Sequence, residues 1–177
     1  NLWGTFGAYT HHGEADLRRG YLNAGIQDSS YASPTVNTLG LRARVDWGKA
    51  FQAAGADFSP YADLSYAVSK LAAYTETGGG FPARFYSRKD KATELRLGVN
   101  ADRPLDNGLQ LVGTLEAAHR FEKDSDRTSG ELLGLFSFNL DGQKNKQDWL
   151  RARVGVEGKL GGGIASLAVN ATTQGET

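Results

Sequence analysis

One property of residues 93–121 limits the possible folds more than any other part of the sequence: apolar and polar side chains alternate along it. Successive side chains of a β-strand point to opposite faces of a sheet, so this alternation predicts strands with one aliphatic and one charged face. Pro104, Asp106, Asn107 and Gly108 interrupt the pattern with residues typical of tight turns. The stretch therefore predicts a hairpin whose strands of about 10 residues have the length of tilted membrane-spanning strands.

The same alternation recurs along the chain and predicts about seven strands. Besides the hairpin, they are Leu2–Tyr9, Thr38–Trp47, Phe58–Tyr74, Trp149–Lys159 and Ile164–Thr173. Long polar connections at residues 11–36, 75–91 and 122–147 alternate with short ones at 48–55, 104–108 and 160–163, and we expect a small strand pair within Leu132–Leu140. Outer-membrane barrels alternate long outer loops with short periplasmic turns in this way. The pattern predicts an all-β fold, an antiparallel up-and-down transmembrane β-barrel of which these strands form part.

The two faces of the predicted strands differ in charge. The polar face carries arginines and acids in about equal number on neighbouring strands, where they can pair across a wet lumen. We expect the following residues to face the lumen: Arg42, Arg44, Asp46, Asp63, Glu94, Arg96, Asp102, Glu116, Arg120, Arg151, Arg153 and Glu157. We expect these to face lipid: Leu39, Leu41, Val45, Leu64, Tyr66, Val68, Leu95, Leu97, Val99, Leu111, Leu115, Leu150, Val154, Val156, Leu167 and Val169. A slip of one residue would exchange the faces, so the pattern also predicts the register.

Composition limits the classes of function. The 20 Lys and Arg balance the 20 Asp and Glu, so no nucleic-acid partner is indicated. Without cysteine there is no disulfide framework or thiolate chemistry. No apolar run reaches the ~18 residues of a transmembrane helix, and the mean hydropathy of -0.44 suits a barrel with a wet lumen and loops. No signal peptide opens the chain, which suggests an internal piece of a longer polypeptide.

No group of residues in the sequence predicts catalysis, a cofactor or a metal. His11 and His12 are adjacent, so they point apart on a strand, and no third ligand is spaced to help them. Gly78–Gly80 and Gly161–Gly163 lack the strand-to-helix context of a phosphate loop. No serine lies in a nucleophile elbow. We expect a protein that is not an enzyme.

Three segments resemble the C-terminal β-domain of autotransporters, the translocator barrels of type V secretion: PYADLSYAVSKLAAYTETGGGFPARF, TELRLGVNADRPLDNG and WLRARVGVEGKLGGG. The resemblance implies a 12-stranded barrel in the outer membrane of a Gram-negative bacterium, through which an N-terminal passenger reaches the cell surface. Its implied partners are that passenger, outer-membrane lipid including lipopolysaccharide, and the barrel-assembly machinery. Against this pattern residues 1–177 are similar to strands five to eleven of one translocator domain, without the earlier strands and the final one.

Two other functions remain open at this point. One is a porin-like outer-membrane channel for small solutes. The other is a soluble β-rich module that binds partners through the loops Thr10–Asn37 and Glu122–Gln147, with contact residues such as Tyr21, Tyr31, Phe81, Phe85 and Tyr86. Trp47 and Tyr74, at the ends of apolar rows, fit the aromatic girdles of a membrane barrel. His119 lies near the end of the lipid-facing row, and we assign it no function.

Overall fold

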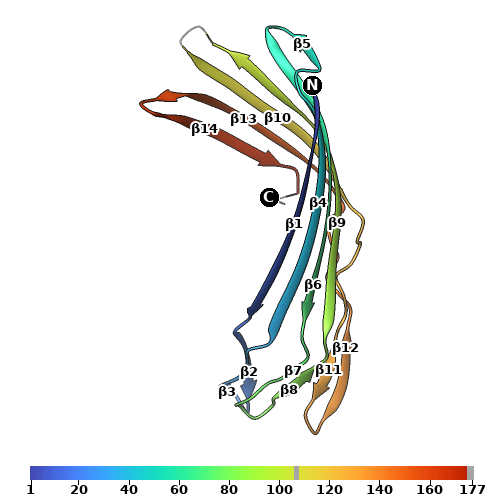
Figure 1. Cartoon of the computed structure of the whole chain (residues 1–177). Helices are drawn as coiled ribbons and strands as arrows, with labels where there is room; N and C mark the ends of the chain where they lie inside the picture. Colours follow the sequence, from blue (N-terminus) through green and yellow to red (C-terminus); the bar gives the residue numbers. More distant parts are fainter. Residues whose placement is uncertain (106–107, 175–177) are drawn as a thin grey trace.

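Seven long antiparallel strands form the main sheet of the protein. The structure is a computed structural model that describes residues 1–105 and 108–174. The strands follow one another in space in chain order (Figure 1): β1 Leu2–Glu14, β4 Thr35–Trp47, β6 Ala56–Leu71, β9 Arg88–Pro104, β10 Leu109–Arg120, β13 Asp148–Leu160 and β14 Gly163–Thr172. This meander of seven strands confirms the all-β, antiparallel prediction.

The sheet curls into a half-barrel with one concave and one convex face (Figure 1). Strand twist makes a wide antiparallel sheet curl, and the alternation of side chains assigns every second residue to each face. Within the described residues β1 pairs only with β4, and β14 pairs only with β13. The curled sheet is therefore open between these two edges.

The long connections fold into short strands at one end of the sheet, which we call the loop end. They form a hairpin of β2 and β3 and a small sheet ordered β12-β11-β8-β7. The bounds are β2 Leu17–Asn23, β3 Ile26–Ala32, β7 Tyr74–Thr75, β8 Ala83–Phe85, β11 Thr128–Leu132 and β12 Phe136–Leu140. A strand pair is present, but only β12 lies within the expected range Leu132–Leu140; β11 ends at Leu132, so the expected bounds of the first strand were wrong.

Two expectations for this end were wrong. Residues 11–36 are largely strand, and nearly half of residues 75–91 are strand, since β1 continues to Glu14 and β9 begins at Arg88. The backbone there continues the ladder beyond the apolar part of each strand, which satisfies its N–H and C=O groups. Tyr74 lies in β7, outside the main sheet, and stacks on Phe85 with ring centroids 4.8 Å apart. It therefore does not belong to an aromatic girdle.

The short connections lie at the opposite end, the turn end. The first contains β5, Phe51–Ala53, which pairs with β6. In the predicted turn after Pro104, Gly108 has a φ of 77°, a value at which a side chain would be strained, whereas Asp106 and Asn107 lie outside the described residues. In the last short connection Gly161 has a φ of 59°.

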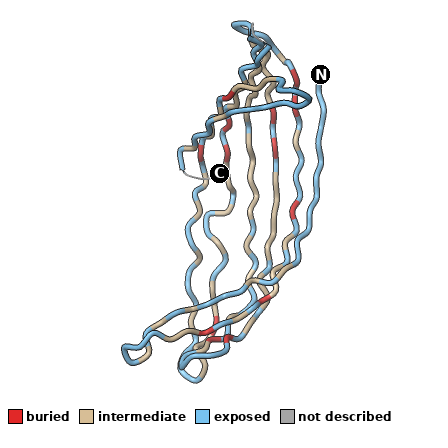
Figure 2. Tube along the Cα trace, turned by 90° about the vertical axis from the view of Figure 1, so that its left-hand side faces the viewer, coloured by how far each residue is buried: buried red, intermediate tan, exposed pale blue. Residues whose placement is uncertain are grey.

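Few side chains are buried, and those of the main sheet are mostly polar or aromatic (Figure 2). Among the described residues they are Asp46, Tyr61, Asp63, Ala118, Glu116 and Trp149. All lie on one face, since each is paired with another member of the set, or lies two residues from such a pair, in the registers of neighbouring strands. Side chains converge on the concave side of a curled sheet and splay apart on the convex side, so the buried set marks the concave face. In the part of the chain that the structure describes, no helix is long and apolar enough to cross a membrane.

Candidate functional site

Arginine and aspartate side chains of β4 and β6 form the first cluster on the concave face. Arg42 holds Asp63 of the neighbouring strand through a bidentate ion pair, in which its Nε lies 2.8 Å from Oδ2. Arg44 binds Asp46 on its own strand, with Nη2 2.6 Å from Oδ1, and its Nη1 lies 3.9 Å from Asp63 Oδ2. The register explains the cluster, because Arg44 lies directly opposite Asp63. Each carboxylate is thus compensated by a fixed guanidinium.

The second cluster continues along β9 and β10. Glu94 binds two arginines, with Oε2 2.7 Å from Arg96 Nη2 and Oε1 3.0 Å from Arg120 Nη2. Arg96 Nη1 also lies 3.8 Å from Glu116 Oε1. Further along, Arg153 and Glu157 of β13 approach within 3.9 Å. Cross-strand neighbours of opposite charge stabilise a sheet, so this face is a network of pairs rather than a field of one sign.

Tyr61 connects the two clusters. Its hydroxyl donates a hydrogen bond to Glu116 Oε2 of β10, and its ring lies beneath the Arg44 guanidinium, whose Cζ is 3.7 Å from the ring centroid. The ring crosses β9 over Gly98, where an added Cβ would lie 2.4 Å from the ring atom Cζ. Only glycine leaves room for this crossing.

The structure places all twelve residues that we expected to face the lumen on the concave face. Most of them contact one another as described. Asp102 and Arg151 share the face but form no ion pair within the described residues. Alternation along β6 and β9 places Tyr61 and Gly98 on this face but gives neither a role, because their contact depends on the register between the two strands.

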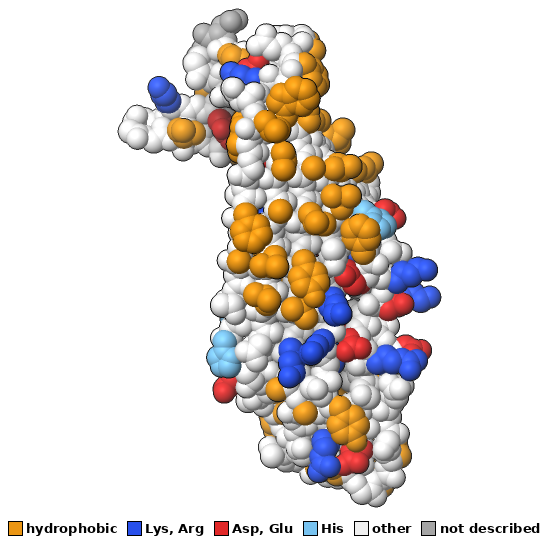
Figure 3. All heavy atoms as spheres, turned by 45° about the vertical axis from the view of Figure 1, so that its right-hand side comes forward, with side chains coloured by type: hydrophobic (Ala, Val, Ile, Leu, Met, Phe, Trp, Pro, Cys, Tyr) orange, Lys and Arg blue, Asp and Glu red, His pale blue; other side chains and the backbone are white. Residues whose placement is uncertain are grey.

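The convex face carries all the residues that we expected to face lipid. Large aliphatic side chains there are exposed, for example Leu97 at 54% and Val154 at 56%. Figure 3 shows hydrophobic side chains gathered over the middle and turn end of this face, with charged side chains towards the loop end. An exposed apolar surface of this extent marks contact with a membrane or a partner.

Two charged residues of β9 mark the ends of this apolar surface, and the distance between them gives its height. Lys91 and Arg103 lie on the convex face and have only uncharged residues between them on that face. Twelve steps of about 3.3 Å, tilted by about 40°, correspond to a height of roughly 30 Å. This height matches the hydrocarbon thickness of a bilayer. Trp47, exposed at the turn end of β4, fits an aromatic girdle.

At the loop end, an ion pair joins segments that are distant in the sequence. Arg19 of β2 binds Glu76 with Nη2 2.6 Å from Oε2, and the same Nη2 donates to the carbonyl of Phe81. The hydrogen bond with Glu76 raises the pKa of Arg19 above its ordinary value, against the effect of burial. Asp28 accepts hydrogen bonds from the Gly80 N–H, the Asn23 amide and the Ser29 N–H, and these lower its pKa. The β2–β3 hairpin is thus docked on residues 76–81, a contact that sequence reasoning missed.

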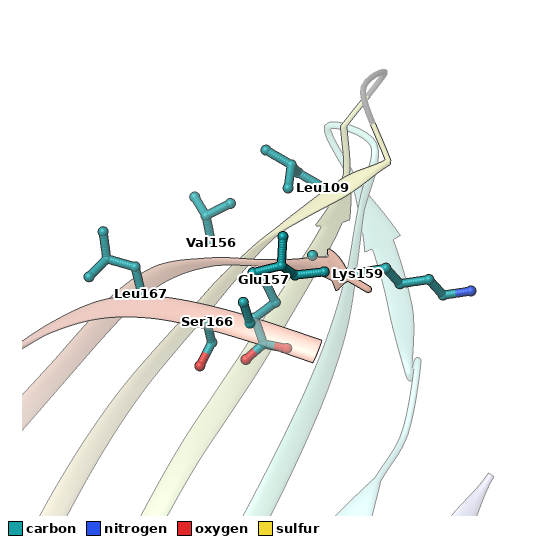
Figure 4. A pocket seen from close by; sticks show the side chains of 9 residues that line it. Leu109, Val156, Glu157, Lys159, Ser166 and Leu167 are labelled. Carbon is teal, nitrogen blue, oxygen red and sulfur yellow. The ribbon is translucent and has the colours of Figure 1, made fainter. Parts of the chain in front are cut away.

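The hollow at the turn end of β10, β13 and β14 is apolar. It has a volume of about 370 Å³ and is lined on the convex side by Leu109, Val156, Gly158 and Leu167. Figure 4 shows Leu109, Val156 and Leu167 on one side of the strands, with Glu157 and Ser166 directed to the other. Glu157, Lys159 and Ser166 also border it, but most of its surface is apolar, so it is a poor candidate for a polar substrate.

The histidines have ordinary structural contacts. His12 Nδ1 lies 2.6 Å from Asn37 Oδ1, and His119 Nδ1 lies 2.7 Å from Asp148 Oδ1. In residues 1–105 and 108–174 no group of three or more His, Asp or Glu side chains could hold a metal ion.

Comparison with known proteins gives one family. The autotransporter beta-domain family model matches residues 1–172, nearly the whole chain. No curated protein matches the sequence.

Proposed function

The chain belongs to the autotransporter beta-domain family, and from that premise we propose how its two faces serve the export of a passenger. Membership implies a Gram-negative outer membrane, in which the domain exports or tethers an N-terminal passenger. The antiparallel half-barrel agrees with such a translocator.

In this proposal the concave face is a passive wall of the translocation pore. The observation that carries it is that most of its carboxylates are already bound to arginines, as at Arg42–Asp63 and Arg96–Glu94. A wall of compensated charges stays hydrated but offers a passing polypeptide few unpaired groups to bind. The passenger therefore moves along it as an extended chain or hairpin without tight binding, and the wall performs no catalysis.

The convex face in this proposal meets the hydrocarbon of the outer membrane. Unpaired strand edges are not stable in lipid, so in this proposal β1 and β14 pair with further strands that close the barrel. The resemblance to autotransporter β-domains implies about 12 strands in total. The proposed partners are the passenger, the lipids of the outer membrane including lipopolysaccharide, and the machinery that inserts outer-membrane barrels.

The export role is tested with an epitope in the passenger of the full-length protein and protease treatment of intact cells. We expect the wild type to expose the epitope, and the neutral double variant Arg42→Gln/Asp63→Asn to expose it nearly as well. Asp63→Arg places a third arginine beside Arg42 and Arg44 and should reduce exposure strongly. An epitope that stays protected in wild-type cells, with solute conductance instead, would favour a porin-like channel. Equal export by all three proteins would refute the passive, charge-compensated wall.

A further inference from the structure

Three lysines form a patch on the convex face at the loop end: Lys70, Lys89 and Lys91. The register places Lys70 of β6 directly opposite Lys89 of β9, and Lys91 follows two residues later on the same face of β9. All three side chains are exposed. Among the described lysines, only Lys49, at the other end of the sheet, forms an ion pair. Like charges directly opposite each other destabilise a sheet, so a bound anion would stabilise the patch.

The acids nearest to the patch are occupied by other donors. Glu122 accepts from Thr93, with Oε2 2.6 Å from the backbone N and Oε1 2.7 Å from Oγ1. Asp126 accepts through Oδ2 from the backbone N of Lys89 at 3.0 Å, and through Oδ1 from the next residue. These hydrogen bonds direct both carboxylates to backbone N–H groups and the Thr93 hydroxyl rather than to the ammonium groups.

A hollow of about 440 Å³ opens beside the patch. Lys89 and Lys91 line it on one side, and Glu122, Asp124, Ser125 and Asp126 line it on the other. Figure 3 shows basic and acidic side chains gathered in this lower part of the convex face, beneath the hydrophobic surface. The three carboxylates disfavour a phosphate inside the hollow, so an anion meets the ammonium groups from the side of the patch that borders the apolar surface.

The position of the patch along the membrane normal indicates which anion it meets. Lys91 ends the apolar part of β9, and Lys89 lies about 5 Å farther out at the rise and tilt of such strands. The long connections of an outer-membrane barrel face the cell exterior, so the patch lies at the headgroups of the outer leaflet. That leaflet consists of lipopolysaccharide, whose lipid A carries phosphates on a disaccharide immediately above its acyl chains.

We propose that Lys70, Lys89 and Lys91 bind the phosphate groups of lipopolysaccharide in the outer leaflet. The inference rests on the proposed contact of the convex face with lipid. Each lysine near an anionic lipid surface contributes a factor of about five in affinity. Loss of all three is therefore expected to weaken binding by about a hundredfold.

The test uses the full-length protein, purified in detergent, and bisphosphorylated lipid A as the probe. Lys70→Gln/Lys89→Gln/Lys91→Gln should lose most of its affinity for this lipid. The matched control, Lys49→Gln/Arg103→Gln/Lys159→Gln, removes three positive charges near the turn end and should bind as the wild type does. Wild-type protein should bind dephosphorylated lipid A, inorganic phosphate and phosphatidylglycerol micelles much more weakly than the bisphosphorylated lipid.

Undiminished binding by an assembled Lys70/Lys89/Lys91 variant would overturn the proposal, as would an equal loss in the control. If the variant does not assemble, the wild type decides: equal binding of phosphorylated and dephosphorylated lipid A refutes the patch. Membrane placement is read separately, from the presence of wild-type protein in outer-membrane fractions. Its absence there would refute the proposed function, whereas normal placement without phosphate preference refutes only the lysine site.

Discussion

Replacement of Leu97 by arginine tests the assignment of the convex face. Leu97 lies midway between Lys91 and Arg103 on β9, with 54% of its surface exposed. An arginine near the midplane of an outer-membrane barrel costs about 2–4 kcal/mol. Removing the leucine forfeits about half of the 1.5–3 kcal/mol that complete burial of such a side chain provides, or about 1 kcal/mol. We therefore expect Leu97→Arg to destabilise the assembled barrel by about 3–5 kcal/mol, a large part of the stability of a typical domain.

The assay has two parts. Heat-modified migration on gels measures the folded fraction of the full-length protein in outer membranes. Denaturant titration in lipid bilayers measures the change in the free energy of unfolding. Val154→Arg, on the same face of β13, should behave like Leu97→Arg because Val154 is exposed to a similar extent, 56%.

Two control variants distinguish the effects of membrane depth and of sheet face from the effect of adding or removing a charge. Ala101→Arg stands on the same face of β9, about 10 Å from Leu97 along the membrane normal, where the cost falls to about 0–1 kcal/mol. Arg96→Gln alters the neighbouring residue on the concave face and leaves Glu94 paired with Arg120. Equal assembly of Leu97→Arg, Ala101→Arg and Arg96→Gln would show that the convex face does not meet hydrocarbon.

Two further predictions concern the Tyr61 crossing and the loop end. Gly98→Val should lower the free energy of unfolding by about 1–3 kcal/mol, because the new side chain displaces the Tyr61 ring. In the control Gly7→Ala, on the same face, the added Cβ meets no atom within 4 Å, so this variant should be neutral in the same titration. The hydrogen bonds that lower the pKa of Asp28 stabilise the docked hairpin fully above the unfolded-state pKa near 3.8, and this contribution is lost as the pH falls through the lower folded-state value. The protection of the Gly80 amide against hydrogen exchange, relative to an unfolded chain at the same pH, should therefore fall only below about pH 4. Protection that stays unchanged down to about pH 2, or an Asp28→Asn variant with the same pH profile, would contradict this.

The faces of the long strands could be predicted because alternation is local information. Leu97 and Arg96 are assigned to opposite faces by their position in the chain alone. The structure places every residue of both predicted sets on the expected side, from Leu39 to Val169 and from Arg42 to Glu157. That the convex face meets lipid, and that the concave face lines a pore, stay predictions which the variants above test.

The loop end could not be predicted in the same way. Arg19 and Glu76 lie 57 residues apart, and their pairing depends on how two short hairpins dock. Short polar hairpins of this kind have no apolar row to fix their register or their partner. Loops were therefore expected in these segments, although β2, β3 and β8 are strands.

The contact of Tyr61 with Gly98 and Glu116 could be predicted only in part, because it depends both on alternation within one strand and on the register between strands. The alternation of β6 places Tyr61 among the charges, but its effect requires Gly98 on the next strand and Glu116 on the strand after that. The tyrosine therefore spans three strands: its ring fills the space above a glycine, and its hydroxyl reaches a buried carboxylate. A shift of β6 against β9 by two residues would keep every side chain on its proper face but would lose this contact. Alternation selects the face, and contacts such as this one distinguish the correct register from those displaced by two.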